Sequence, residues 1–167
     1  MKCLCFSDSH GSSRLMRHAL MLHPDAEVVF FLGDGLTDVI PLIDTEPRRA
    51  WFCVRGNCDH ISALGSMDTP KIDSVTLEGK KIVYTHGDLY GVKYGMSGLE
   101  RLAESSGADI VLFGHTHTPC EKFQPNDDGG VYYFNPGSVG GGYFSSASYG
   151  VINITDGGIL LSHGELA

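Results

Sequence analysis

Two histidines separated by one threonine follow an apolar segment in the second half of the chain. They are His115 and His117, in the stretch LFGHTHTP. In extended backbone, residues i and i+2 point to the same side, so both imidazoles would face one spot. Such a pair could chelate a metal ion, although a loop with two solvated histidines is an equally simple interpretation. Other polar residues of the chain decide between a chelating pair and a solvated loop.

Further potential metal ligands stand directly after other apolar segments of the chain. They are Asp8, His10, Asp34, Asn57 and His86. If these segments are strands of parallel sheets, the ligands lie at the carboxyl ends of the strands, where binding sites gather. Glycines stand beside most of them, at points where sharp turns and close backbone approach are needed. We therefore expect all seven side chains to converge.

The donor set contains aspartate, asparagine and histidine but no cysteine. Mixed oxygen and imidazole ligation suits divalent transition ions and argues against calcium or a cysteine-rich structural zinc site. Seven side chains are too many for one tetrahedral ion. Two ions about 3.5 to 4 Å apart, sharing one carboxylate, would use them all and form a clamp for phosphoryl transfer. We expect manganese first, with iron, zinc, cobalt or nickel as alternatives.

The first half of the chain alternates apolar strands with helical segments. Strands are predicted at 2–7, 27–32 and 50–54. One helix is predicted from a capping Ser12 or Ser13 to a stop at Pro24, and a second at 37–44, which Pro41 either starts or interrupts. This alternation predicts parallel strand pairing in an α/β layer structure.

The second half is richer in strands. Hairpins are predicted for 73–77 with 81–85, for 120–124 with 131–134, and for 151–155 with 159–162. Between the first two hairpins, a helix at 97–105 leads to a strand at 109–113. A mixed β-sandwich with helices on its outer faces fits this order.

Composition narrows the class of protein. A length of 167 residues predicts one domain, 1–167, and a net charge of −8 argues against a long nucleic acid as partner. The longest apolar run, 28–32, is far below the roughly 20 residues of a membrane helix, and no signal peptide is evident. We expect a cytoplasmic protein without a membrane partner and with reduced cysteines.

The ordered motifs resemble those of the calcineurin-like metallophosphoesterase superfamily. The stretch GNCD at 56–59 and the small size resemble its single-domain bacterial branch, the YfcE-type phosphodiesterases, and the turn at 135–138 resembles a further turn of that branch. The resemblance implies an α/β four-layer sandwich, with two mixed β-sheets packed together and helices on the outer faces. The motifs are DSH at 8–10, GD at 33–34, GN at 56–57, HG at 86–87 and GHTH at 114–117.

The resemblance also implies a ligand set and an activity. The chain would hydrolyse a small phosphate ester, as a phosphodiesterase, by in-line attack of a metal-bridging hydroxide. Asp34 would bridge the ions, and the implied catalytic residues are Asp34, His115, Asn57 and Cys58. One ion would take Asp8, His10, Asp34 and His117, and the other would take Asp34, Asn57, His86 and His115.

One position departs from the wider superfamily. Cys58 stands where relatives usually have a histidine that binds phosphate or protonates the leaving group, and a neutral thiol is a poorer acid. His60 could replace that histidine, or it could be a surface residue. Asp59 and Asp88 could orient ligands or be solvated acids, and Arg14 could meet the phosphate or lie on the surface of its helix.

Other functions remain open at this point. A retromer subunit has the same fold and works chiefly as an interaction scaffold, but it has lost part of the ligand set, whereas this chain keeps all seven positions. A phosphomonoesterase or a nucleotide phosphatase could use the same site, and a homo-oligomer is possible. The loops at 57–71 and 137–142 are expected to line the pocket.

Overall fold

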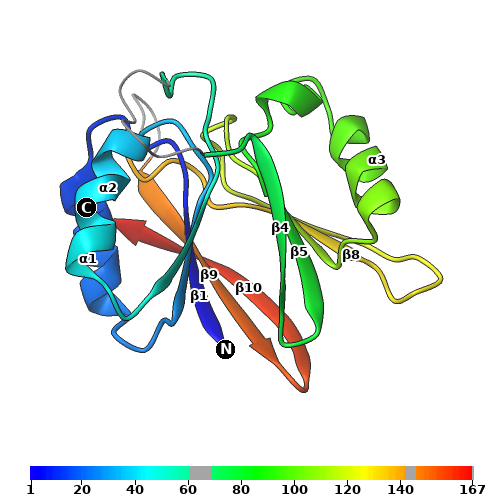
Figure 1. The fold of residues 1–167 in the computed structure, drawn as a ribbon. Helices are drawn as coiled ribbons and strands as arrows, with labels where there is room; N and C mark the ends of the chain where they lie inside the picture. Colours follow the sequence, from blue (N-terminus) through cyan, green and yellow to red (C-terminus); the bar gives the residue numbers. More distant parts are fainter. Residues whose placement is uncertain (61–68, 142–145, 167) are drawn as a thin grey trace.

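The computed structural model describes residues 1–60, 69–141 and 146–166. Two five-stranded sheets lie between helices, with α1 and α2 on one side and α3 on the other (Figure 1). The helices are α1 (Ser13–Leu22), α2 (Leu36–Thr45) and α3 (Ser97–Ser106), with the short 3-10 helix η2 (Asp88–Tyr90). The strands are β1 (Lys2–Phe6), β2 (Val28–Phe31), β3 (Ala50–Cys53), β4 (Ile72–Leu77), β5 (Lys80–Thr85), β6 (Ile110–Leu112), β7 (Cys120–Gln124), β8 (Val131–Asn135), β9 (Ala147–Thr155) and β10 (Gly158–Leu166).

Both sheets are mixed, as predicted. The first has the order β10-β9-β1-β2-β3, and β1, β2 and β3 run parallel. The second has the order β4-β5-β6-β8-β7, and β5, β6 and β8 run parallel. In Figure 1, β1 and β5 both run upward, so the turns that follow them lie at the top of the molecule.

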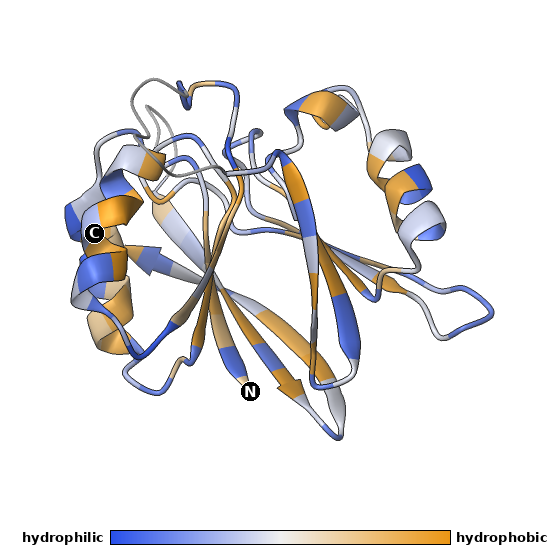
Figure 2. Cartoon of the chain, viewed as in Figure 1, coloured by the Kyte–Doolittle hydropathy of each residue, from blue (hydrophilic) through white to orange (hydrophobic). Residues whose placement is uncertain are grey.

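The alternation of side chains along each strand produces the layers. In β1, Leu4 and Phe6 pack toward α1 and α2, whereas Cys3 and Cys5 pack between the two sheets. Strand β6 does the same with Val111 facing α3 and its neighbours facing the other sheet. A strand that is buried on both faces is apolar throughout, and Figure 2 shows such apolar strands in both sheets. The expected four-layer sandwich is confirmed.

Proline 41 lies inside α2, so the prediction that it starts or interrupts that helix is wrong. The apolar residues Leu36, Val39 and Leu42 bury one stripe of the helix against the sheet, and Pro41 is exposed on another face. Because packing of this stripe stabilises the helix on both sides of the proline, the loss of one backbone hydrogen bond does not end it.

Strands β9 and β10 are longer than predicted, and each contains a glycine that resembles a loop signal in the sequence. A Cβ on Gly150 would lie 2.3 Å from the ring of Phe134, and one on Gly164 would lie 2.3 Å from the ring of Tyr149. Gly150 therefore makes room for a ring from the other sheet, and Gly164 for a ring from the neighbouring strand β9.

Parts of the two expected pocket loops, 61–68 and 142, lie outside the described residues. Among the described helices, none is long and apolar enough to cross a membrane.

Candidate metal centre

Six of the seven predicted ligands come together in two groups of three. Each group consists of one aspartate and two histidines, and its potential ligand atoms all lie within 4.8 Å of one another. The ligands follow β1, β2, β5 and β6, so the carboxyl ends of strands from both sheets build the centre. The first triad is Asp8, His10 and His117, and the second triad is Asp34, His86 and His115.

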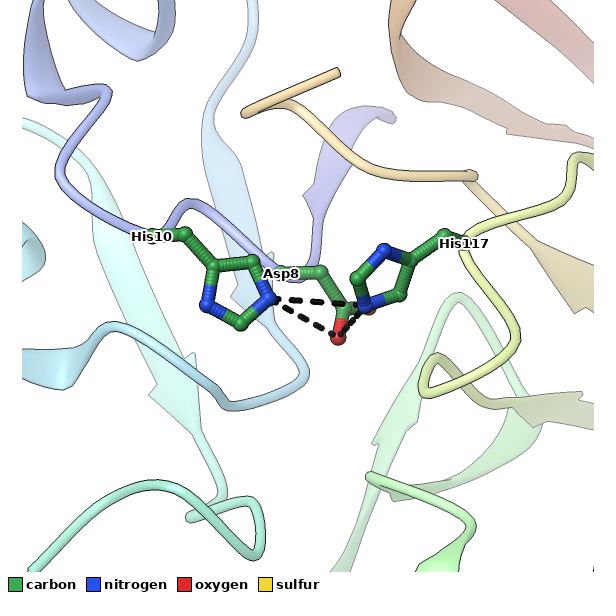
Figure 3. A group of neighbouring side chains, drawn as sticks. All are labelled: Asp8, His10 and His117. Atoms are coloured by element: carbon green, nitrogen blue, oxygen red, sulfur yellow. Dashed lines mark hydrogen bonds and ion pairs between the residues drawn. The ribbon is translucent and has the colours of Figure 1, made fainter. Parts of the chain in front are cut away.

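In the first triad, two imidazoles approach one carboxylate from opposite sides (Figure 3). Nε2 of His117 lies 3.1 Å from Oδ1 of Asp8, and Nε2 of His10 lies 4.0 Å from the same oxygen. The two Nε2 atoms are 3.4 Å apart. Three ligand atoms thus face one point, although they come from loops more than a hundred residues apart.

The two oxygens of Asp8 have different surroundings. Oδ2 accepts hydrogen bonds from Ser7 Oγ at 2.6 Å and from the His115 backbone N–H at 3.1 Å. Oδ1 is buried and makes no well-directed hydrogen bond among the described residues, and its nearest polar neighbour is Nε2 of His117 at 3.1 Å. A buried carboxylate oxygen without a well-directed hydrogen bond costs roughly several kcal/mol of stability unless a bound ligand offsets its charge. A cation held between Oδ1 and the imidazoles would do so.

In the second triad, a backbone carbonyl determines which ring nitrogen of the fully buried His86 carries the hydrogen. Nδ1 of His86 lies 2.8 Å from the carbonyl oxygen of Leu32. Because a carbonyl only accepts, Nδ1 carries the hydrogen, and the lone pair of the neutral ring is on Nε2. That Nε2 lies 3.1 Å from Nδ1 of His115 and 3.4 Å from Oδ2 of Asp34. It is also 4.0 Å from Oδ1 of Asp8, and this contact connects the two triads.

The titration of these groups reflects their mutual contacts. Burial by itself disfavours the charged form of Asp34, but the contact with His86 and the Cys58 backbone N–H outweigh it and hold the pKa well below its usual range. Burial also opposes protonation of His86, yet Asp34 and Asp8 raise its pKa overall. The contact with Asp8 raises the pKa of His117, whereas burial and then His86 lower the pKa of His115. Carboxylates and imidazoles so arranged fit divalent transition ions.

Five of the six triad residues have left-handed backbone, which overturns the expectation of an extended His115–His117 pair. Residues other than glycine rarely adopt positive φ, and such strain gathers at functional sites. His115 and His117 consequently face different triads. Five of the six described non-glycine residues with positive φ are predicted ligands: Asp8 at 54°, His10 at 44°, Asp34 at 60°, His115 at 68° and His117 at 59°.

Two carboxylates hold these turns, and only one of them was considered from sequence. Asp59 accepts four backbone N–H groups, from Asp34, Gly35, Leu36 and Gly56, at 2.7 to 2.9 Å. Its interpretation as an orienting residue is therefore correct.

Asp38 was missed, because an acid in the first turn of a helix carries no further signal in the sequence. Its Oδ2 accepts Ser9 Oγ and the Gly11 N–H, both at 2.7 Å.

Two glycines allow the ligand turns to approach. A Cβ on Gly114 would lie 1.9 Å from Ser7 Oγ and 3.0 Å from Asp8 Oδ2. A Cβ on Gly56 would lie 2.0 Å from Asp34 Oδ1. Any side chain at either position would displace an aspartate of the centre.

The side chain of Asn57, the seventh predicted ligand, contacts its neighbour Cys58. Its exposed amide Nδ2 donates to Cys58 Sγ at 3.3 Å, while the Cys58 N–H donates to Asp34 Oδ1 at 2.8 Å. Cys58 and His60 instead line a hollow of about 350 Å³ beside His10 and Asp34.

The remaining residues considered from sequence lie elsewhere. Asp88 forms an ion pair with Lys71 at 3.1 Å and makes no described hydrogen bond to a ligand. Arg14 is exposed on α1, as expected for a surface charge.

Comparison with known proteins gives the family. The model of the calcineurin-like phosphoesterase superfamily domain matches residues 1–157. The phosphodiesterase YfcE of Escherichia coli K12 is 31% identical over 176 aligned positions, which cover 92% of this chain and 88% of YfcE.

Two solved structures share the fold. A predicted phosphoesterase of Streptococcus pneumoniae superposes with a TM-score of 0.80 at 25% identity, over 98% of this chain and 88% of that one. Vps29 of Entamoeba histolytica, solved in complex with zinc, has a TM-score of 0.73 at 19% identity over 99% of both chains, which shows a common fold alone. The family model, the identity with YfcE and the motif order together establish that the chain belongs to the calcineurin-like phosphoesterase superfamily.

Proposed function

We propose that this chain is a two-metal phosphodiesterase that hydrolyses a small phosphate ester. One observation carries the proposal: the buried Oδ1 of Asp8, which makes no well-directed hydrogen bond, has the Nε2 atoms of His117, His10 and His86 within 4.0 Å. A buried carboxylate oxygen surrounded by imidazole nitrogens from both triads is an arrangement that divalent cations would stabilise. Membership of a phosphoesterase superfamily supports the same chemistry.

The proposed ligand assignment follows the two triads. Asp8, His10 and His117 would hold one ion and His86 and His115 the other, with Asp34 shared between them. Asn57 would complete the second group after rotation of its amide away from Cys58. When bound, such ions lower the pKa of a coordinated water and offset the charge of a phosphate.

Neighbouring residues of the chain hold the proposed ligands in fixed orientations. The Leu32 carbonyl orients the ring of His86, and Ser7 together with the His115 N–H orients Asp8, so both ligands are fixed before anything binds. Asp38 and Asp59 hold the turns after β1 and β2. Cys58 and His60 face the hollow beside Asp34, where we propose that the leaving group departs.

The test is hydrolysis of bis(p-nitrophenyl) phosphate by the purified protein. We expect the activity to be lost after chelation and restored by Mn²⁺, and to be abolished in Asp34→Asn and His115→Ala. His18→Ala, an exposed histidine on α1, is the matched control and should retain activity. A folded protein that binds metal but hydrolyses neither diesters nor monoesters would contradict the proposal and favour an interaction scaffold on the same fold.

A further inference from the structure

Lys93 lies beside the metal centre in the segment between η2 and α3. The Tyr94 backbone N–H donates to the Gly91 carbonyl at 2.8 Å, which closes a turn with Val92 and Lys93 at its middle positions. Val92 is buried in this turn, and Lys93 is exposed. The turn therefore presents a cation to solvent from an anchored backbone.

The anchor places this turn against two turns that carry ligands. A Cβ on Gly87 would lie 3.0 Å from a methyl carbon of Val92 and 3.7 Å from the carbonyl oxygen of Gly114. Gly87 directly follows the ligand His86, and Gly114 directly precedes the ligand His115. The side chain of Val92, the residue next to Lys93, thus packs against the turn that follows the ligand His86.

Lys93 is near enough to His115 and His117, one histidine of each triad, for its charge to act on both imidazoles. A positive charge this close to the centre would also attract an anion bound there.

Lys93 has no carboxylate partner among the described residues, whereas four of the other five lysines have one. Lys71, for example, pairs with Asp88 at 3.1 Å and Lys122 with Glu100 at 3.0 Å. The hollow beside Cys58 has no lysine or arginine among the described residues that line it, and its wall includes Asp38 and Asp59. Among the described residues, the hollow side of the centre therefore supplies no lysine or arginine, whereas the segment between η2 and α3 supplies Lys93.

We propose that Lys93 is a specificity-determining residue that binds a second negative charge on the phosphoryl group of the substrate. The inference rests on the proposed function of this site. A simple diester carries one charge, whereas a monoester or terminal phosphoryl group carries nearly two above its second pKa of about 6. With Lys93, the site would accept dianionic phosphoryl groups as well as monoanionic diesters.

The experiment compares two substrates that differ in charge. Wild-type protein, Lys93→Gln and Lys93→Arg, each loaded with Mn²⁺, are assayed at pH 8 on p-nitrophenyl phosphate and bis(p-nitrophenyl) phosphate. We expect Lys93→Gln to lower kcat/KM for the monoester about tenfold, as for loss of a charged hydrogen bond, and to change the diester value less than about threefold. Lys93→Arg should restore most of the monoester activity.

Arg17→Gln is the matched control, because Arg17 is an exposed cation on α1 without a described ion pair. It should leave the ratio of the two activities unchanged. An equal loss on both substrates in Lys93→Gln, or no loss on either, would overturn the inference.

A binding measurement separates this inference from the proposed function. Calorimetric titration of the Mn²⁺-loaded protein with inorganic phosphate should give a Kd at least about fivefold weaker in Lys93→Gln than in wild type. If the wild-type protein hydrolysed neither ester, the proposed function would fail, yet weaker phosphate binding would still support the role of Lys93. Equal phosphate affinity in both proteins would overturn that role.

Discussion

The carboxylate of Asp59 accepts the backbone N–H of Asp34 at 2.7 Å. The same carboxylate accepts the N–H groups of Gly35 and Leu36, at 2.8 and 2.9 Å. Asp34 is thus held at its backbone by one acid while its own carboxylate faces His86. Since Asp34 has positive φ, the bonds to Asp59 offset strain at the residue proposed to bridge the ions.

The first prediction concerns Asp59→Asn. The substituted amide has one acceptor oxygen, so about half of the four backbone N–H groups would face an NH₂ group. We expect the free energy of unfolding to fall by roughly 2 kcal/mol, as measured by chemical denaturation. Affinity for Mn²⁺ should fall as well, because the turn that carries Asp34 loosens. Asp156→Asn, at an exposed turn, should change neither quantity.

The second prediction separates the two triads. His10→Ala removes a ligand of the first triad, and His115→Ala removes a ligand of the second. We expect wild-type protein to bind two Mn²⁺ ions per chain and each variant to retain one ion of high affinity, as counted by elemental analysis after dialysis. The double variant should retain neither. If either single variant lost both ions together, the triads would be one site and not two.

The third prediction is the order in which the histidines titrate in metal-free protein. Contact with Asp8 raises the pKa of His117; burial opposes protonation of His86, but Asp34 and Asp8 raise its pKa overall. Burial, followed by His86, lowers the pKa of His115. In an NMR titration, His117 and His86 should therefore lose their protons above about pH 6.5, the ordinary value, and His115 below it. The reverse order would contradict the described geometry.

The same shifts determine how metal binding depends on pH. A raised pKa means that the proton remains on the imidazole to higher pH, where it competes with the ion. Mn²⁺ affinity should therefore still rise with pH beyond about 6.5, by up to roughly tenfold per pH unit for each proton displaced, and level off once pH exceeds the raised pKa values. Calorimetry in two buffers of different ionisation enthalpy measures the protons released.

Much of the fold was predictable because its signals are local. The doubly buried strands are apolar runs in the sequence, and the polar residues at their carboxyl ends predicted all six ligands that the structure brings together in the two triads. The tolerance of Pro41 in α2 was not predictable, since it depends on packing of the opposite helix face. The same holds for Gly150, whose role depends on the ring of Phe134 from another sheet.

The residues that hold the ligand turns in place could be predicted from the sequence only in part. Asp59 adjoins a ligand turn in sequence, so its role could be considered, whereas Asp38 acts on Ser9 and Gly11 from a helix 27 residues or more away. The left-handed backbone at His115 also had no local signal, because only glycine adopts positive φ readily. Tertiary contacts impose that conformation, so an extended pair was the natural but wrong expectation.

The last prediction concerns Cys58, which lines the hollow beside Asp34 and His10. Cys58 is exposed, but local desolvation and the neighbouring Asp34 carboxylate raise the pKa of its thiol, so it stays protonated and neutral near pH 7. A thiol so disposed gives little general acid catalysis to a departing alkoxide. The wild-type protein should therefore prefer esters with good leaving groups.

Cys58→His would place a stronger acid at the same position. We expect its rate on an alkyl phosphodiester to rise at least about tenfold relative to its rate on an aryl diester, because only the alkoxide needs a proton as it leaves. Cys58→Ser, which adds no acid of suitable pKa, serves as the control and should leave the ratio near the wild-type value. Rates on leaving groups of graded pKa give the slope that measures this effect. An identical slope in wild type and Cys58→His would mean that another group, such as His60, already donates the proton.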